Sequence, residues 1–318
     1  MLAVMDKNTG IKTAACVNLL DEPTLPPGGQ IFPYQTVITA TTVDEASAVV
    51  DQIMEIMGEV MRGRIPPPEV FETLDNPEAP RSEVNTLHGK INEEILLRLF
   101  CIAGAAYTSG NLKRKSPVNT LYQAVELLGF QKVKALVLAL AFFSGTDPQM
   151  KLLFAQAYAT SVLAGFLAQQ MEYRQESARK VEIGGLLLDV GRVWLMLYQK
   201  QCQGKGPLID NAFEMQWHPL MGDKIARHYH MPAYVSAMIL STALHLNGKY
   251  LMLIGVARLA HNAVAASFHQ HQNRLAFSCD TPKPDDDMNT HIATIIADQF
   301  RAVGLANHLF VVQRATTA

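Results

Sequence analysis

The sequence predicts an all-α protein, a multi-helix bundle with an N-terminal arm and a C-terminal helical extension. Three observations support this fold class. Apolar residues recur every three or four positions through consecutive long segments, helix start and stop residues separate these segments, and few runs alternate as a strand requires. The chain has 318 residues, of which 49% are hydrophobic and 18% charged, so a large core can lie under a modest charged surface.

The N-terminal part of the chain holds several prolines and glycines with little periodicity, which is typical of a loose arm. Residues 31–42 are rich in β-branched side chains and predict a short extended segment, which Pro33 confines to an edge. A helix is expected to begin at Thr42, because Glu45 three residues later completes a capping box. It should end near Gly63, just ahead of three consecutive prolines.

The helix predicted over residues 43–62 carries a narrow apolar stripe in alternating steps of three and four, like the seam of a coiled coil. Ile53, Met57 and Val60 form the C-terminal half of this stripe. Two interpretations remain open. The stripe docks on the chain's own domain, or it is an interaction helix for a partner or for homodimerisation, in which case changing Ile53 and Met57 to aspartate should disrupt assembly.

The rest of the chain reads as helical almost throughout. Ser116 and Pro117 offer an N-cap and a first-turn proline, and Gly129 ends the segment that they start. Asp147 and Pro148 repeat the same starting pattern. The other helices are expected at about residues 131–143, 176–201, 219–230, 232–245, 250–271 and 291–303, with a polar mobile loop over residues 278–287.

These boundaries divide the chain into three parts. Residues 1–63 form an N-terminal arm and amphipathic helix, residues 64–271 form the helical domain, and residues 272–318 form a C-terminal loop and helix.

Charge and cysteine usage exclude several classes of function. With 27 basic and 29 acidic residues the formal net charge is -2. The chain therefore has no overall positive field to attract nucleic acid or an anionic membrane, and neither is expected as a partner. The four cysteines lie far apart and form no CxxC pair. This usage is typical of reduced thiols, so a cytoplasmic protein is expected. The longest apolar run, residues 135–143, is about half of a bilayer span, and no signal peptide is recognisable.

Four segments agree in order and spacing with one known family. They are residues 119–129 (NTLYQAVELLG) leading into 132–138 (KVKALVL), residues 184–192 (GGLLLDVGR), residues 218–226 (HPLMGDKIA), and the Met-Pro at 231–232 before an AMIL helix. Over residues 64–265 the chain resembles the HDOD family, the HD-related output domain of bacterial signalling proteins. The resemblance implies an HD-like helical bundle.

HDOD domains are similar to HD phosphohydrolases, in which a histidine, a His-Asp pair and a later aspartate hold a divalent metal that activates water. At the position that the resemblance gives to the His-Asp pair this chain has Leu188 and Asp189, and at the later aspartate it has Arg258. A leucine cannot bind a metal, and a guanidinium repels one. The resemblance therefore implies a degenerate site with no metal, no cofactor and no catalysis.

The resemblance also groups four residues into a candidate vestigial pocket: Asp189, His218, His245 and Arg258. Asp189 is expected to be a buried carboxylate paired with Arg258. His218, directly before Pro219, is expected at a helix start with a capping hydrogen bond. His245 should lie near a helix end, where the helix dipole favours a cation.

The function predicted from these observations is that of a non-catalytic bacterial regulatory scaffold, which binds a signalling protein of unknown identity or a small ligand. One alternative is a divergent metal-dependent phosphohydrolase of nucleotides or cyclic dinucleotides that uses Asp189, His218 and His245. Another is a small-ligand sensor, in which ligand occupancy of the old cavity carries the signal.

Overall fold

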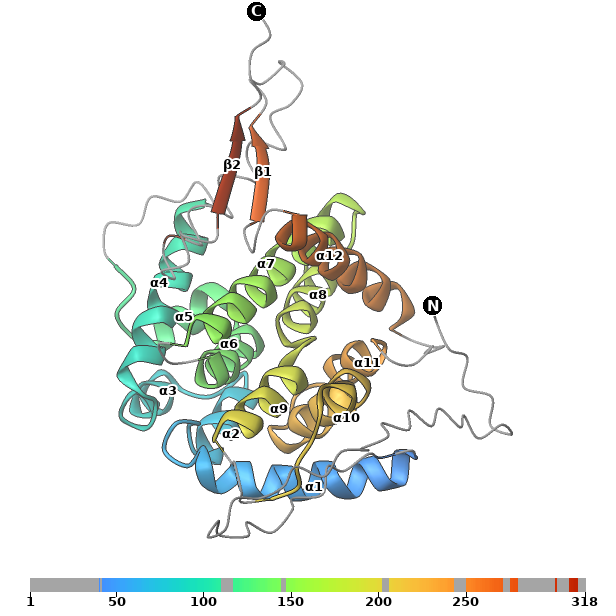
Figure 1. Cartoon of the computed structure of the whole chain (residues 1–318). Helices are drawn as coiled ribbons and strands as arrows, with labels where there is room; N and C mark the ends of the chain where they lie inside the picture. The colour runs from blue at the N-terminus through green and yellow to red at the C-terminus, as the bar shows by residue number, and fades with distance from the viewer. Residues whose placement is uncertain are drawn as a thin grey trace, which may run out of the picture. The chain divides into compact units, whose positions relative to one another are not determined.

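Helices make up most of the chain that the computed structural model describes, namely residues 40, 42–109, 117–143, 147–201, 206–242, 250–270, 275–279, 301 and 309–313 (Figure 1). All of these residues belong to one of two compact units, Thr36–Ala318. The predicted all-α fold is confirmed. The helices are α1 (Val43–Val60), α2 (Pro68–Asp75), α3 (Arg81–Thr86), the 3-10 turn η1 (Leu87–Lys90), α4 (Glu93–Ser109), α5 (Leu121–Leu128), α6 (Phe130–Phe143), α7 (Pro148–Gln170), α8 (Gln175–Leu187), α9 (Val190–Gln201), α10 (Asn211–His228), α11 (Ala233–Leu240) and α12 (Leu251–Gln270).

The start of α1 confirms the predicted capping box. The Thr42 hydroxyl accepts a hydrogen bond from the Glu45 amide at 3.2 Å, and the Glu45 carboxylate accepts one from the Thr42 amide at 3.2 Å. Two amides that the helix itself cannot satisfy are thus paired. The helix ends at Val60, close to the predicted Gly63.

The apolar stripe of α1 is buried within this chain. Ile53 and Met57 have no exposed surface, and Val60 is partly buried against the same hydrophobic core. The first interpretation, docking on the chain's own domain, therefore describes α1. The assignment of Ile53 and Met57 to an interaction surface is corrected, because their side chains already fill the core and offer nothing to a partner.

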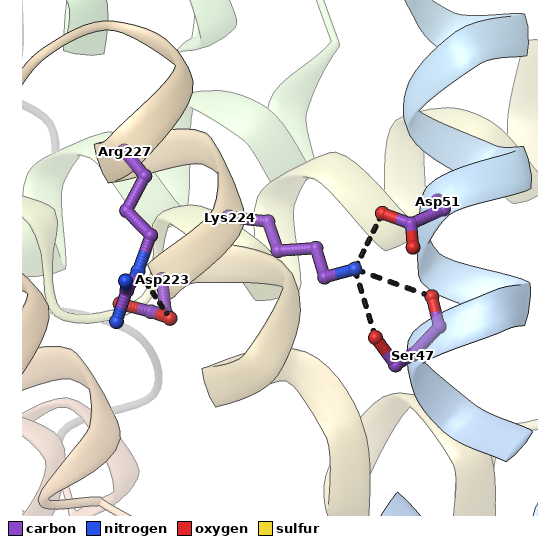
Figure 2. A network of polar contacts seen from close by, with 5 residues as sticks. All are labelled: Ser47, Asp51, Asp223, Lys224 and Arg227. Atoms are coloured by element: carbon purple, nitrogen blue, oxygen red, sulfur yellow. Dashed lines mark hydrogen bonds and ion pairs between the residues drawn. The ribbon is translucent and has the colours of Figure 1, made fainter. Parts of the chain in front are cut away.

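Polar contacts complement this docking. Figure 2 shows Lys224 of α10 reaching α1, where its ammonium donates to the Ser47 hydroxyl at 2.9 Å and to the Asp51 carboxylate. On the same stretch of α10, the Arg227 guanidinium donates to Asp223 Oδ2 at 2.9 Å. These bonds fix α1 along α10, although exposed ion pairs contribute little energy compared with the buried stripe.

Replacing Ile53 with alanine is expected to lower the free energy of unfolding by about 3 kcal/mol, because the truncation leaves a cavity beneath α1. Replacing Glu55, which is exposed on the same helix, with alanine should change the free energy of unfolding by less than about 0.5 kcal/mol. Urea unfolding followed by circular dichroism measures both. Light scattering should show an unchanged mass for Ile53→Ala, whereas a lost assembly with unchanged stability would contradict the docking of α1.

A buried lysine joins α6 to two other helices. Lys134 has no exposed surface, and its ammonium donates to Asp75 of α2 at 2.5 Å and to the His230 carbonyl at 2.9 Å. His230 lies just beyond α10 with a φ of 51°, where it ends the helix. The cation thus lies at the negative end of the α10 dipole. Burial lowers the pKa of Lys134, and the hydrogen bond and charge of Asp75 oppose that change.

Several element boundaries differ from the sequence predictions. Gly129, with a φ of 84°, separates α5 from α6 as predicted, and Asp147 caps α7 as predicted. However, α5 does not begin at Pro117. Thr120 is its N-cap, because its hydroxyl accepts from the Gln123 amide at 3.2 Å. The N-terminal arm, the segment at residues 31–39, Ser116 and His245 lie outside the described residues.

The C-terminal part contains a feature that the sequence patterns did not predict. Strand β1 (Leu275–Cys279) pairs in parallel with β2 (Leu309–Gln313), in register from Leu275 opposite Leu309. The start of the predicted loop at residues 278–287 is therefore a strand end. The helix predicted over residues 291–303 lies outside the described residues except at Arg301, which is helical.

Two described helices are long and apolar enough to cross a membrane by length and composition, α7 and residues Leu251–His269 of α12. In α7, 56% of the apolar window is buried, and the helix packs against α8 and α12. That pattern is typical of a core helix in a soluble domain. In α12 the buried share is 33%.

Candidate functional site

The candidate site surrounds the junction of α8 and α9. The sequence predicts one helix over residues 176–201, but the structure has two, separated by a turn at Leu188 and Asp189. The Asp189 carbonyl accepts a hydrogen bond from the Val193 amide at 3.1 Å, so Asp189 begins α9. A carboxylate at this end of a helix is favoured by the helix dipole.

Close helix contacts explain the glycines of this segment. A β-carbon on Gly184 would lie 1.8 Å from the Met238 sulfur of α11, and one on Gly191 would lie 1.9 Å from the His218 carbonyl of α10. On Gly185 it would lie 3.3 Å from the α7 backbone. The GGLLLDVGR segment therefore lets α7, α10 and α11 approach α8 and α9 closely.

Asp189 pairs with His261, a residue to which the family resemblance gives no role. Its Oδ2 lies 3.5 Å from Nδ1 of His261 on α12, and both side chains are partly buried. The expected ion pair with Arg258 is not present, although both residues are described. That prediction was wrong by one helical turn, because His261 follows Arg258 by three positions and faces the α8–α9 junction instead.

His218 lies in the middle of α10, although the sequence predicts it at a helix start. The helix begins at Asn211, where Asp210 is the N-cap, and it contains Pro219. A proline has no amide hydrogen, so the Met215 carbonyl loses its usual helical donor. His218 Nδ1 lies 3.1 Å from that carbonyl and 3.1 Å from the Glu214 carbonyl. Because carbonyls only accept, Nδ1 carries the proton, and Nε2 remains available to another group.

Leu188, which the resemblance places where HD phosphohydrolases have a metal-binding imidazole, is buried in the hydrophobic core. Near it the donors are the Asp189 carboxylate and the His261 imidazole, and these already face each other. In the described part of the chain no three His, Cys, Asp or Glu residues form a group that could hold a metal ion. A divalent hydrolytic metal needs more donors than this pair offers, so the described residues do not fit the HD metal centre.

Two further polar residues emerge only from the structure. His261 could have been found from its spacing, one turn after Arg258 on the same side of a helix. Asp223 is buried, accepts from Arg227 through Oδ2, and has no hydrogen-bond partner at Oδ1. It follows Gly222, whose backbone lies against Gly191. No pattern of spacing marks Asp223, because its burial depends on the crossing of α9 and α10.

Comparisons with known proteins find one family and several solved structures that are similar to this chain. The model of the HDOD domain matches residues 66–244. The chain is similar to a crystal structure of an HDOD domain protein of unknown function from Geobacter sulfurreducens, with 15% identity, a TM-score of 0.46, and coverage of 81% of this chain and 88% of that chain.

A second similar structure is that of a proposed metal-dependent phosphohydrolase from Shewanella amazonensis SB2B, with 13% identity, a TM-score of 0.47, and coverage of 81% of this chain and 99% of that chain. A proposed phosphohydrolase from the same organism has 16% identity, a TM-score of 0.43, and coverage of 76% and 87%. The search of curated proteins finds no match.

Proposed function

Because the chain belongs to the HDOD family, we propose that it is a non-catalytic regulatory scaffold of a bacterial signalling system, which works by binding a protein partner or a small ligand in the cytoplasm. The observation that carries this proposal is the donor set at the α8–α9 junction. A buried leucine stands where an HD hydrolase has an imidazole, and the remaining carboxylate is paired with His261.

The same junction supports a regulatory role in physical terms. Asp189 and His261 are 19% and 30% exposed, so a small polar ligand can reach them. On either side of Asp189, α8 and α9 meet α11 and α10 without spare volume, at Gly184 and Gly191. A ligand that displaces α8 or α9 when it binds this pair would therefore also displace their neighbours, and packed interfaces of this kind shift between discrete arrangements.

The catalytic alternative is tested with the wild-type chain and Asp189→Asn. Both are incubated with nucleotides and cyclic dinucleotides in the presence of Mn²⁺ or Mg²⁺, and phosphate release is measured. We expect no release above background from either protein, because too few donors are available to activate water. Turnover by the wild type that Asp189→Asn abolishes, with a stoichiometric transition metal retained on dialysis, would establish a divergent phosphohydrolase and overturn the scaffold.

The binding role is tested by thermal shift with the same nucleotides on the wild type and Asp189→Asn. A ligand at a hundredfold excess over its dissociation constant adds about 2.7 kcal/mol to stability, which is a readily measured shift. A shift lost in Asp189→Asn would support a ligand at the junction. No shift with any nucleotide would favour a protein partner, which affinity capture from extract of the native cell would then identify.

A further inference from the structure

Arg258 is a partly buried cation for which the surrounding chain supplies no anion. It is the single Asp, Glu, Lys or Arg within α12. In the part of the chain that the structure describes, its guanidinium has no ion pair and no hydrogen bond. Lys132 is also partly buried, but it pairs with Glu182, and Lys224 pairs with Asp51 in the same way. A cation withdrawn from water without a counter-ion is unfavourable, so Arg258 indicates an anion from outside the chain.

Among the described elements that pack against α12, none offers Arg258 a free carboxylate. These elements are α7, α8, α11 and β1. There is no Asp or Glu in α7, α11 or β1. The acidic residues of α8 are Glu176 and Glu182, and each of them already pairs with a lysine. The counter-ion that Arg258 lacks is therefore not found in the helices and the strand around it.

His261 supplies a second polar group beside Arg258. It follows Arg258 by three positions, which places both residues on one side of α12 with β-carbons about 5–6 Å apart. Its Nδ1 lies 3.5 Å from Oδ2 of Asp189. Because a carboxylate only accepts, Nδ1 carries the proton, and Nε2 of the neutral imidazole is an acceptor. The His261 side chain is 30% exposed, so a small ligand can reach it.

We propose that Arg258 and His261 bind a phosphate group that retains a proton. The guanidinium donates to two phosphate oxygens, as its fork geometry favours, and the hydroxyl on a third oxygen donates to Nε2 of His261. Asp189 is then a positioning residue, which holds the imidazole through Nδ1. A carboxylate would leave no oxygen for His261, and a sulfate has no proton for it. This assignment rests on the proposed ligand-binding function and names the class of ligand.

Calorimetric titration of the full chain at pH 7 with inorganic phosphate and with sulfate tests the site. Phosphate is expected to bind at least about tenfold tighter than sulfate, because the hydrogen bond to His261 needs the phosphate hydroxyl. Arg258→Gln should weaken phosphate binding at least about tenfold. Arg258→Lys, which keeps the charge without the fork, should recover part of this loss. His261→Leu should abolish the preference for phosphate over sulfate.

The matched control is Arg179→Gln, which removes the same charge from an exposed position on α8. It should leave phosphate binding unchanged, and circular dichroism should show every variant folded. Titration with adenosine monophosphate at pH 6, where about half of a phosphate monoester retains its proton, separates a free phosphate ligand from an ester. Binding of the ester that is lost in Arg258→Gln assigns a monoester, and binding of inorganic phosphate alone assigns the free ion.

The site is overturned if the wild type binds neither phosphate nor the ester, or if Arg179→Gln weakens binding as much as Arg258→Gln does. A protein partner captured from extract would still support the scaffold in that case, so the two proposals fail separately. Equal affinity for phosphate and sulfate would overturn the role of His261. Turnover of the ester would instead overturn the non-catalytic function and leave the phosphate site standing.

Discussion

Replacing Gly191 with alanine is expected to destabilise the protein by about 3 kcal/mol. The added β-carbon would lie 1.9 Å from the His218 carbonyl oxygen and 2.4 Å from the Gly222 amide nitrogen. Both are backbone atoms of α10, which cannot rotate away as a flexible side chain can. The helices must separate instead, and overpacking of a close contact costs about 1–3 kcal/mol or more. Urea unfolding gives the difference in free energy.

The matched control is Gly58→Ala, in which the new β-carbon on α1 would meet nothing within 4 Å. This substitution should stabilise the protein by about 0.5–1 kcal/mol, because alanine is the better helix former. The pair of variants thus separates a packing requirement from helix propensity. Equal effects of the two substitutions would show that α9 and α10 do not cross at Gly191.

Replacing Asp75 with alanine is expected to lower the free energy of unfolding by about 2–3 kcal/mol. The substitution leaves the ammonium of Lys134 in the core without its counter-ion. Breaking a fully buried pair costs about 3–5 kcal/mol, and the 34% exposure of the Asp75 side chain reduces that figure. Lys134→Met should cost less, below about 1.5 kcal/mol, because the carboxylate that remains can be hydrated.

The pH dependence of Asp75→Ala follows from the lowered pKa of Lys134. Losing Asp75 lowers this pKa further, since Asp75 raises it in the wild type. Between the folded pKa and the unfolded pKa, the unfolded chain binds more protons, so stability increases with pH. The deficit of Asp75→Ala should therefore shrink as the pH rises toward 10.5, the ordinary pKa of a lysine. The deficit of Lys134→Met should not shrink, and a parallel decrease in both would contradict this account.

Local chemistry made much of the fold predictable from the sequence. Helix ends are set by residues that lie next to them in the chain: Thr42 with Glu45, Asp147 with Pro148, and Gly129. These residues cap or end their own helix, so their effect needs no distant residue. The helix predicted over residues 131–143 is likewise present as α6, and its residues from Val133 to Phe143 are buried. These elements depend on contacts within a few residues of each other.

The candidate site was less predictable. The resemblance to the HDOD family directed attention to Leu188 and Asp189, and the structure places both at a helix junction. It did not identify His261 as the partner of Asp189, and the proline within α10 was mistaken for a helix start. A proline inside a helix and a proline in its first turn look alike in sequence. They differ in whether a carbonyl one turn earlier loses its amide donor, as the Met215 carbonyl does here, and only the structure shows this.

The sequence by itself determined the all-α class and the helix ends at Thr42, Gly129 and Asp147, because these depend on residue type and short-range hydrogen bonding. Only the tertiary structure decided that the apolar stripe of α1 is buried, that α8 and α9 separate at Asp189, and that Asp189 faces His261. Each of these depends on which helices lie against one another. Packing between residues far apart in the chain sets that arrangement, and the periodicity of a single helix does not encode it.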